Sequence, residues 1–396
     1  MLLKMSITIP EGKLGEKIKA QVIGAKGSRI KLIQEASGSK VILKGQKVLI
    51  SGGNANLAME MVRDSIANTI SVYVHPSKIV VLLKVSPTQR FKFQPFSSFG
   101  GQITYRLTEY NGTDPEVVTA QLANQSYMPY SKHELLQVIS QSMPKSSTST
   151  ADPQHKYKVE LSLGVQTFYH ANRQLKLDAN LLRRVFTFNS FAATQIGFGK
   201  DIKATWNNQI TDQQYDELWE RLSYFVPISE ERQIKCSMVS ISKQLRIGMK
   251  FKVNQIDAAI TPGKVYLDGM IPLYCTILNI NEGYDLRFRI IDKGPEVSAW
   301  PELSDYINGL NYNPETLQLD SVSDDIRMHY YRTRDKYVFH HPELDLKMTI
   351  YRVYDHNEGV GVNYLNISFG LISKDHQLDR LVELNTVVMQ LLGISE

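Results

Sequence analysis

Gly24-Ala25-Lys26-Gly27 is the segment whose residue types and spacing most clearly suggest chemistry. Two glycines three residues apart allow a sharp turn, because backbone without a Cβ atom reaches left-handed conformations and can approach a ligand closely. A helix that begins directly after Gly27 would add unpaired N–H groups and the positive end of its dipole. Lys26 and Arg29 add positive charge. The predicted chemistry is binding of a phosphate backbone.

The sequence on both sides of this loop must supply the elements that position it. Apolar residues recur at helical or alternating spacing through residues 1–72. The spacing predicts a strand over residues 6–9, helices over 13–23 and 28–36, strands over 40–43 and 47–51, and a helix over 54–72. A Ser-Gly pair at residues 37–38 ends the second helix.

The run from Val22 to Leu43 resembles the signature of type I K-homology (KH) domains. It contains Val-Ile-Gly-x-x-Gly, isoleucines at positions 30 and 33, a Ser-Gly turn and an apolar strand. The resemblance covers residues 1–75 and implies a β-α-α-β-β-α fold that holds about four nucleotides of single-stranded RNA. The site residues it implies are Val22, Ile23, Gly24, Ala25, Lys26, Gly27, Ser28, Arg29, Ile30, Ile33, Lys40, Val41 and Ile42.

The implied surface lacks one common device for holding bases. Residues 1–70 contain no Phe, Trp or Tyr, so apolar side chains and the backbone near Lys40 to Ile42 would have to contact the bases. Four nucleotides give few contacts, so we expect a protein partner or a second RNA-binding module to add affinity. The phenylalanines at 91–99 could form such a second RNA-binding surface, or they could pack in a core. The basic positions 246, 250 and 252 could also form it, or they could lie on a solvated strand face.

Positive charge is concentrated in the same part of the chain. Residues 1–70 carry eleven Lys or Arg and five Asp or Glu, whereas the net charge of the whole chain is +5. The remaining residues therefore balance at −1. This distribution indicates that the N-terminal region is the part that meets a polyanion.

Composition bounds the class of protein. A hydrophobic content of 42% with 21% charged residues is typical of soluble globular chains. No run of eighteen apolar residues occurs, and Met1 to Pro10 resemble neither a secretory signal nor a transit peptide, so we expect no membrane partner. Cys236 and Cys275 are predicted to be buried thiols in a reducing compartment. We expect a cytoplasmic protein, with a nuclear or mitochondrial location left open.

Residues 157–396 alternate polar and apolar side chains over many strand-length segments. They predict an α+β body, an antiparallel sheet or barrel with packed helices, of unknown function. Predicted strands cover residues 157–163, 234–241, 245–253, 266–280, 284–291, 337–340, 346–354 and 362–371, and predicted helices cover 212–224, 301–310 and 377–392. Residues 76–141 form a connecting α/β segment that could belong to this body, and residues 142–156 form a linker or loop.

Several carboxylates on or near predicted strands raise the question of an enzyme. They are Glu160, Asp285, Asp292, Asp345, Asp355 and Glu358. A tunnel-type, metal-dependent RNA triphosphatase would need paired glutamates that alternate along strands, but residues 158–162 offer one acidic position. No catalytic motif, cofactor site or metal-ligand set is recognised.

The residues together predict a non-enzymatic protein that binds single-stranded RNA, specifically mRNA, through the Gly-x-x-Gly loop. Its body would act as a protein-interaction or ribonucleoprotein scaffold in post-transcriptional regulation. Two alternatives stay open: an interaction subunit with a vestigial KH fold, and an RNA-processing enzyme such as a tunnel-type triphosphatase.

Overall fold

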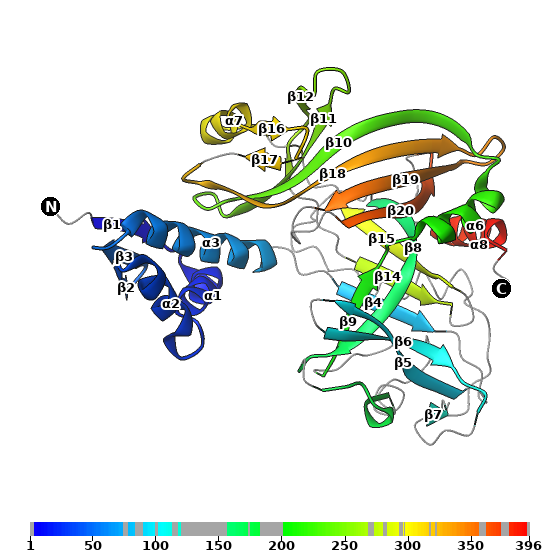
Figure 1. Ribbon diagram of the computed structural model, residues 1–396, viewed down its shortest axis with the longest axis horizontal. Helices are drawn as coiled ribbons and strands as arrows, with labels where there is room; N and C mark the ends of the chain where they lie inside the picture. Colours follow the sequence, from blue (N-terminus) through cyan, green and yellow to red (C-terminus); the bar gives the residue numbers. More distant parts are fainter. Residues whose placement is uncertain are drawn as a thin grey trace, which may run out of the picture.

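The protein has a small N-terminal module and a large body built on one sheet (Figure 1). The computed structural model describes residues 4–73, 78–83, 90–99, 102–112, 118–119, 157–172, 175–182, 201–267, 273–279, 283–292, 296, 298–316, 318–320, 323–355, 362–373 and 380–393. The linker predicted over residues 142–156 lies outside these residues.

The N-terminal module contains three strands and three α-helices. In chain order they are β1 (Lys4–Thr8), α1 (Gly12–Ile23), α2 (Ser28–Ser37), β2 (Lys40–Lys44), β3 (Lys47–Ser51) and α3 (Ala55–Tyr73), with one 3-10 turn at Ala25–Gly27 between α1 and α2. Each begins and ends within two residues of the range that the apolar spacing predicts. The strands pair antiparallel in the order β1-β3-β2.

One face of this small sheet packs on the helices. Ile18, Val22, Ile33 and Val48 are fully buried there, because the apolar positions of each helix recur on its inner side. Gly15 lets α1 lie against the chain that enters it, since a Cβ atom there would be 1.8 Å from the Pro10 carbonyl oxygen.

Helix α3 joins the module to the body. Val239 and Ile241 of the body pack into the module's core. Arg327 of the body lies 2.7 Å from the Glu60 carboxylate and 3.9 Å from that of Asp64. The contact is thus a small apolar patch with charged pairs beside it.

The body sheet has the strand order β12-β11-β10-β18-β19-β20-β8-β15-β14-β4, with further strands attached at β5, β8 and β11. All described pairs are antiparallel except β14 with β4, which confirms the antiparallel α+β expectation. Because β4 and β6 pair with strands of the body, this part of the connecting segment belongs to the body.

The strands of the body are β4 (Lys78–Leu83), β5 (Arg90–Phe99), β6 (Gln102–Glu109), β7 (Val118–Thr119), β8 (Tyr157–His170), β9 (Ile202–Asn207), β10 (Val226–Ser240), β11 (Leu245–Val253), β12 (Ile260–Pro262), β13 (Tyr266–Leu267), β14 (Leu273–Leu278), β15 (Asp285–Asp292), β18 (Ile326–His340), β19 (Leu346–Asp355) and β20 (Val362–Leu371). A separate hairpin comprises β16 (Asn311–Asn313) and β17 (Gln318–Asp320). The longer helices are α6 (Asp212–Leu222), α7 (Pro301–Asn308) and α8 (Leu381–Leu391). No helix in the described parts of the chain combines the length and apolarity needed to span a membrane.

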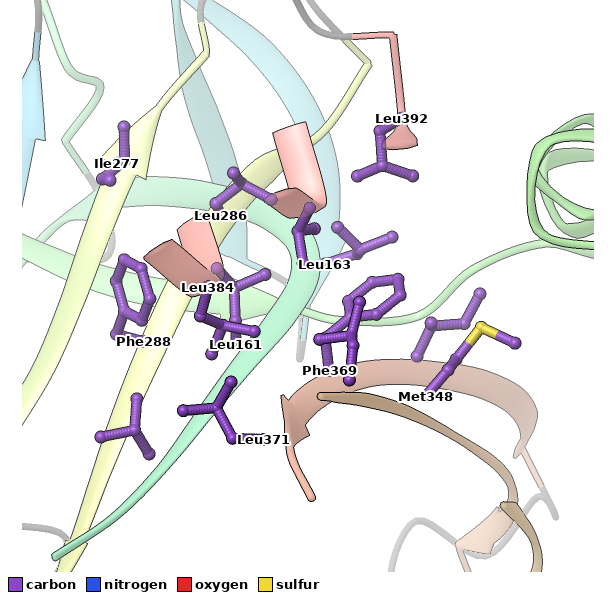
Figure 2. Close-up of a cluster of buried hydrophobic side chains, with 14 of the residues drawn as sticks. Leu161, Leu163, Ile277, Leu286, Phe288, Met348, Phe369, Leu371, Leu384 and Leu392 are labelled. Carbon is purple, nitrogen blue, oxygen red and sulfur yellow. The ribbon is translucent and has the colours of Figure 1, made fainter. Parts of the chain in front are cut away.

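The main apolar core lies between the sheet and helices α6 and α8. Figure 2 shows Leu161, Phe288 and Phe369, from three adjacent strands, gathered around Leu384 of α8. A second core packs the outer side of β10 and β11 against Leu303 and its neighbours on α7. Since side chains alternate along a strand, burial of one face leaves the intervening residues on the other face.

Candidate functional site

The Gly24–Gly27 loop adopts a backbone that few residue types tolerate. Gly24, Lys26 and Gly27 all have positive φ, at 74°, 52° and 81°. A Cβ atom on Gly24 would lie 2.6 Å from both Cβ and the backbone N of Arg29, whereas one on Gly27 would meet nothing within 4 Å. Gly24 is therefore required by conformation and by space, and Gly27 by conformation alone.

This backbone leaves the tip of the loop open to solvent. Ala25 and Lys26 are exposed, and helix α2 begins immediately after the loop, at Ser28. The N–H groups in the first turn of α2 lack partners within the helix, so they remain available to an acceptor. The sequence thus places a flexible cation and helix-terminal donors side by side.

Strand β2 lies at the edge of the module's sheet and faces α2. Its only strand partner among the described residues is β3. The Val41 N–H donates to Oε1 of Gln34 on α2, at 3.1 Å. Lys40 and Ile42, on either side, are exposed. A ligand between the loop and β2 would therefore meet the Gln34 amide as well as the strand backbone.

Burial divides the residues that the KH resemblance implies. Val22, Ile33 and Val41 are at most 4% exposed and belong to the module's core, so they support the surface from beneath. The others reach solvent at least in part. They are Ile23, Gly24, Ala25, Lys26, Gly27, Ser28, Arg29, Ile30, Lys40 and Ile42.

The phenylalanines considered as a second surface mostly serve the core. Phe91 is fully buried, and the Phe93 ring lies 5.8 Å from that of Phe168. Phe96 is exposed, and the side chain of Phe99 lies outside the described residues. Core packing therefore accounts for Phe91 and Phe93.

The body carries a second candidate surface on the face of its sheet that is turned away from the cores on α6, α7 and α8. Strand pairing places one set of ionisable side chains there, and basic residues outnumber acidic ones. We call this the charged face and define it as Lys158, Glu160, Glu231, Lys235, Lys250, Lys252, Arg289, Arg332, Arg334 and Lys336.

Glu160 is the most tightly held group of the charged face. It accepts from Lys158 and lies 3.5 Å from a terminal guanidinium nitrogen of Arg289. Burial alone would raise the pKa of Glu160, but the charges of Lys158, Arg289 and Lys235 outweigh it and lower the pKa to about 2. The carboxylate therefore stays ionised and offsets only part of the positive charge around it.

The long strands of the body sheet are strongly curved. Strands β18, β19 and β20 separate β10, which carries Lys235, from β8, which carries Glu160. Figure 1 shows β10 and β18 as one long arch beside these strands.

Glu231 forms the other acidic point of the charged face. Its carboxylate accepts from Lys336 and lies 3.8 Å from the Lys252 ammonium. Arg334, one row away, donates to Gln233 at 2.9 Å and stacks 4.3 Å over the Tyr351 ring. An arginine and a tyrosine ring therefore lie in contact beside the ion pairs of Glu231.

Among the carboxylates considered for catalysis, those whose side chains the structure describes are held by separate partners. Asp285 is buried and accepts from the backbone N–H of Gln166 at 2.7 Å and of Asn279 at 2.9 Å, and burial raises its pKa to about 6. Asp345 pairs with Arg380. Glu358 and the side chains of Asp292 and Asp355 lie outside the described residues. Within the described part, no group of three His, Cys, Asp or Glu side chains is arranged to hold a metal ion.

The two cysteines are buried, as their apolar contexts predict. Neither is in a disulfide, and burial raises the pKa of both Cys236 and Cys275 to about 12. These thiols therefore serve as small apolar groups in the cores.

Sequence reasoning located Lys250 and Lys252 on one strand but missed the charged face as a whole. Its members come from five strands that are spread over residues 157–340 of the chain. The alternation of polar and apolar residues shows which side chains of one strand share a face. It does not show which strands pair with one another.

No protein-family model and no curated protein matches the chain. Among solved structures, the RNA triphosphatase Pct1 of S. pombe, in complex with the Spt5 CTD, has a TM-score of 0.38 at 12% identity and covers 69% of this chain and 97% of its own. The PH1819 protein from Pyrococcus horikoshii OT3 has a TM-score of 0.24 at 13% identity, covering 48% of this chain and 89% of its own. At these TM-scores neither likeness carries an argument about fold, activity or ligand.

Proposed function

We propose that the N-terminal module is a KH-type domain that binds single-stranded RNA through the Gly24–Gly27 loop. The observation that carries the proposal is the loop's backbone: positive φ at Gly24, Lys26 and Gly27 turns the exposed Lys26 toward solvent directly before the first turn of α2. Phosphate oxygens would accept from these donors, and Arg29 would add charge.

Bases would lie on the partly exposed apolar side chains of Ile23, Ile30 and Ile42. The edge of β2, with the Gln34 amide that already bonds to it, would meet the base edges. Without aromatic residues in the first 70 positions, the module would gain little from stacking and would hold a short strand weakly.

The body would then act as the scaffold of a ribonucleoprotein assembled on mRNA. The packing of α3 onto β10, β11 and β18 supports a role in which captured RNA and the body stay in a fixed relation. We place this role in cytoplasmic post-transcriptional regulation.

The direct test is the double substitution Ala25→Asp and Lys26→Asp. Both side chains are exposed, so the fold should persist, while the new carboxylates should repel the phosphate backbone of the RNA. We expect the dissociation constant for a labelled RNA of about 12 nucleotides, followed by fluorescence anisotropy, to rise at least about tenfold. Wild-type affinity in a folded double variant would reject the proposal, as would a wild-type chain that binds no RNA.

A matched control changes the same total charge elsewhere on the module. Lys13→Asp with Ala20→Asp alters two exposed positions of α1. Binding should fall only slightly in this variant, because long-range charge alone is screened over about 10 Å at 0.1 M salt. Equal losses in the two double variants would show that the loop has no special role.

A further inference from the structure

Three cations stand side by side across the middle of the charged face. The strand register sets Lys250 on β11 directly opposite Lys235 on β10, and Lys235 directly opposite Arg332 on β18. Side chains in such positions are about 5 Å apart, and like charges placed so repel one another. We call these three residues the cation row.

The groups around the cation row add to the positive potential. Protein atoms crowd the Lys250 ammonium although its side chain reaches solvent, and this desolvation, with the charges of Arg334, Lys158 and Lys235, lowers its pKa to about 8. On β15, Nε of Arg289 is buried and has no hydrogen-bond partner. Glu160 and Glu231 offset only part of this charge, because each of the two carboxylates is shared among several cations.

Aromatic rings lie among these cations. Arg334 stacks on Tyr351 at 4.3 Å, and Arg332 lies 5.6 Å from the centre of the Tyr330 ring. Basic side chains interleaved with aromatic rings are typical of surfaces that follow a single-stranded nucleic acid. An acidic peptide would use the cations but has no need of the rings.

We propose that the charged face binds the phosphate backbone of single-stranded RNA, as a second contact for the strand whose other part the Gly24–Gly27 loop holds. The inference rests on the proposed function for the identity of the ligand. Two linked weak sites bind one long strand tightly, because the second contact forms at a high effective concentration. A strand of about four nucleotides would engage the loop alone.

The test replaces two members of the cation row, Lys235→Gln with Lys250→Gln, in the full-length chain. We expect the dissociation constant for an RNA of about 20 nucleotides to rise about tenfold, and the affinity for one of about four to stay unchanged. The log–log salt slope for the long RNA should become shallower by about 0.7 for each phosphate that the variant no longer neutralises. Thermal stability should be kept or raised, since the row's repulsion is relieved.

Two further variants make the result specific. Lys176→Gln with Lys203→Gln removes two exposed lysines outside the charged face and should leave long-RNA binding unchanged. Glu160→Gln increases the net positive charge of the face, so it should tighten long-RNA binding several-fold. Damage to the fold cannot produce a gain of affinity.

The outcomes separate the two proposals. Unchanged long-RNA affinity and salt slope in the Lys235→Gln, Lys250→Gln variant would overturn the inference while leaving the loop's role intact. Loss of long-RNA binding in that variant, with Ala25→Asp, Lys26→Asp binding like wild type, would instead remove the loop's role. If a labelled oligo-glutamate peptide binds in a cation-row-dependent manner and RNA does not, the face docks an acidic protein and the inference is wrong.

Discussion

The N-terminal module and the body position their candidate ligand-binding residues in different ways. The module holds them on a loop outside a small core, where two glycines set the backbone. The body holds them on a sheet face, and the reverse of that face carries the apolar cores on α6, α7 and α8. Local sequence therefore decides the first site, whereas pairing of distant strands decides the second. The residues of the first site lie in one short segment, but those of the second come together only when the sheet forms.

The largest expected effect comes from Phe369→Ala, which empties part of the body's core behind the charged face. We expect it to lower the free energy of unfolding of the body by about 3–5 kcal/mol. All three tryptophans, at positions 206, 219 and 300, lie in the body, so their fluorescence during urea unfolding follows this loss.

The matched change in the module is Ile33→Ala, at a fully buried position of α2. It should cost about 2–5 kcal/mol and appear in far-UV circular dichroism, with little change in the tryptophan transition. If both variants show a single unfolding transition that shifts by the same amount, the module and the body unfold as one unit. That result would contradict the contrast between the two regions.

Acid should distinguish two carboxylates of the body. Burial raises the pKa of Asp285 from 3.8 to about 6, so its ionisation in the folded state opposes folding as the pH rises through this range. The difference corresponds to about 3 kcal/mol. For Glu160 the sign is reversed: its pKa is lowered to about 2, so its stabilisation is complete above 4.5 and disappears as the pH falls toward 2.

The variant Asp285→Asn tests this sign. It leaves one backbone N–H of Gln166 or Asn279 without an acceptor at every pH, but it also removes the buried charge. The cost of the substitution, measured by urea unfolding, should therefore be about 2–3 kcal/mol greater at pH 4 than at pH 7. A cost that is equal at both pH values, or greater at pH 7, would contradict the raised pKa.

The two loop glycines offer a smaller, internal contrast. Gly24→Ala should destabilise the module by about 2–3 kcal/mol, because φ of 74° with ψ of 171° suits glycine alone and a Cβ atom would meet Arg29. Gly27→Ala should cost about 1 kcal/mol, since it strains φ in open space. Circular dichroism melts of both variants measure the difference, and equal costs would show that the close approach to Arg29 relaxes freely.

The smallest effect concerns the contact between the two regions. Glu60→Gln weakens the ion pair between residue 60 and Arg327. Arg327 still has the Asp64 carboxylate 3.9 Å away. Because Glu60 is on the surface, we expect less than about 1 kcal/mol, seen as a slight shift in urea unfolding that vanishes at high salt. A larger effect would mean that α3 depends on this ion pair more than on Val239 and Ile241.

The sequence predicted the elements of the module and several strands of the body closely. The ranges 245–253 and 362–371 match β11 and β20 at both ends, because alternation there is regular. It missed the first half of β10 and most of β18, since residues 226–233 and 326–336 are largely polar or charged on both faces. Alternation signals a strand only where one face is apolar.

Of the two candidate sites, only the loop could be predicted from sequence. The glycine spacing and Lys26 lie within one short segment, although burial of Val22, Ile33 and Val41 narrowed the set of residues that can touch a ligand. The cation row depends on which residues of β10, β11 and β18 stand opposite one another, and that register is fixed by tertiary pairing.

The most direct test of the central claim is a crosslinking map of RNA on the full-length protein. A single-stranded RNA of about 20 nucleotides that contains 4-thiouridine would be irradiated with the wild-type chain, and the crosslinked peptides would be identified by mass spectrometry. We predict crosslinks within residues 22–43 and on β10, β11 or β18, with the first group absent in the Ala25→Asp, Lys26→Asp variant. Crosslinks confined to other parts of the chain, or unchanged within residues 22–43 in that variant, would contradict the account.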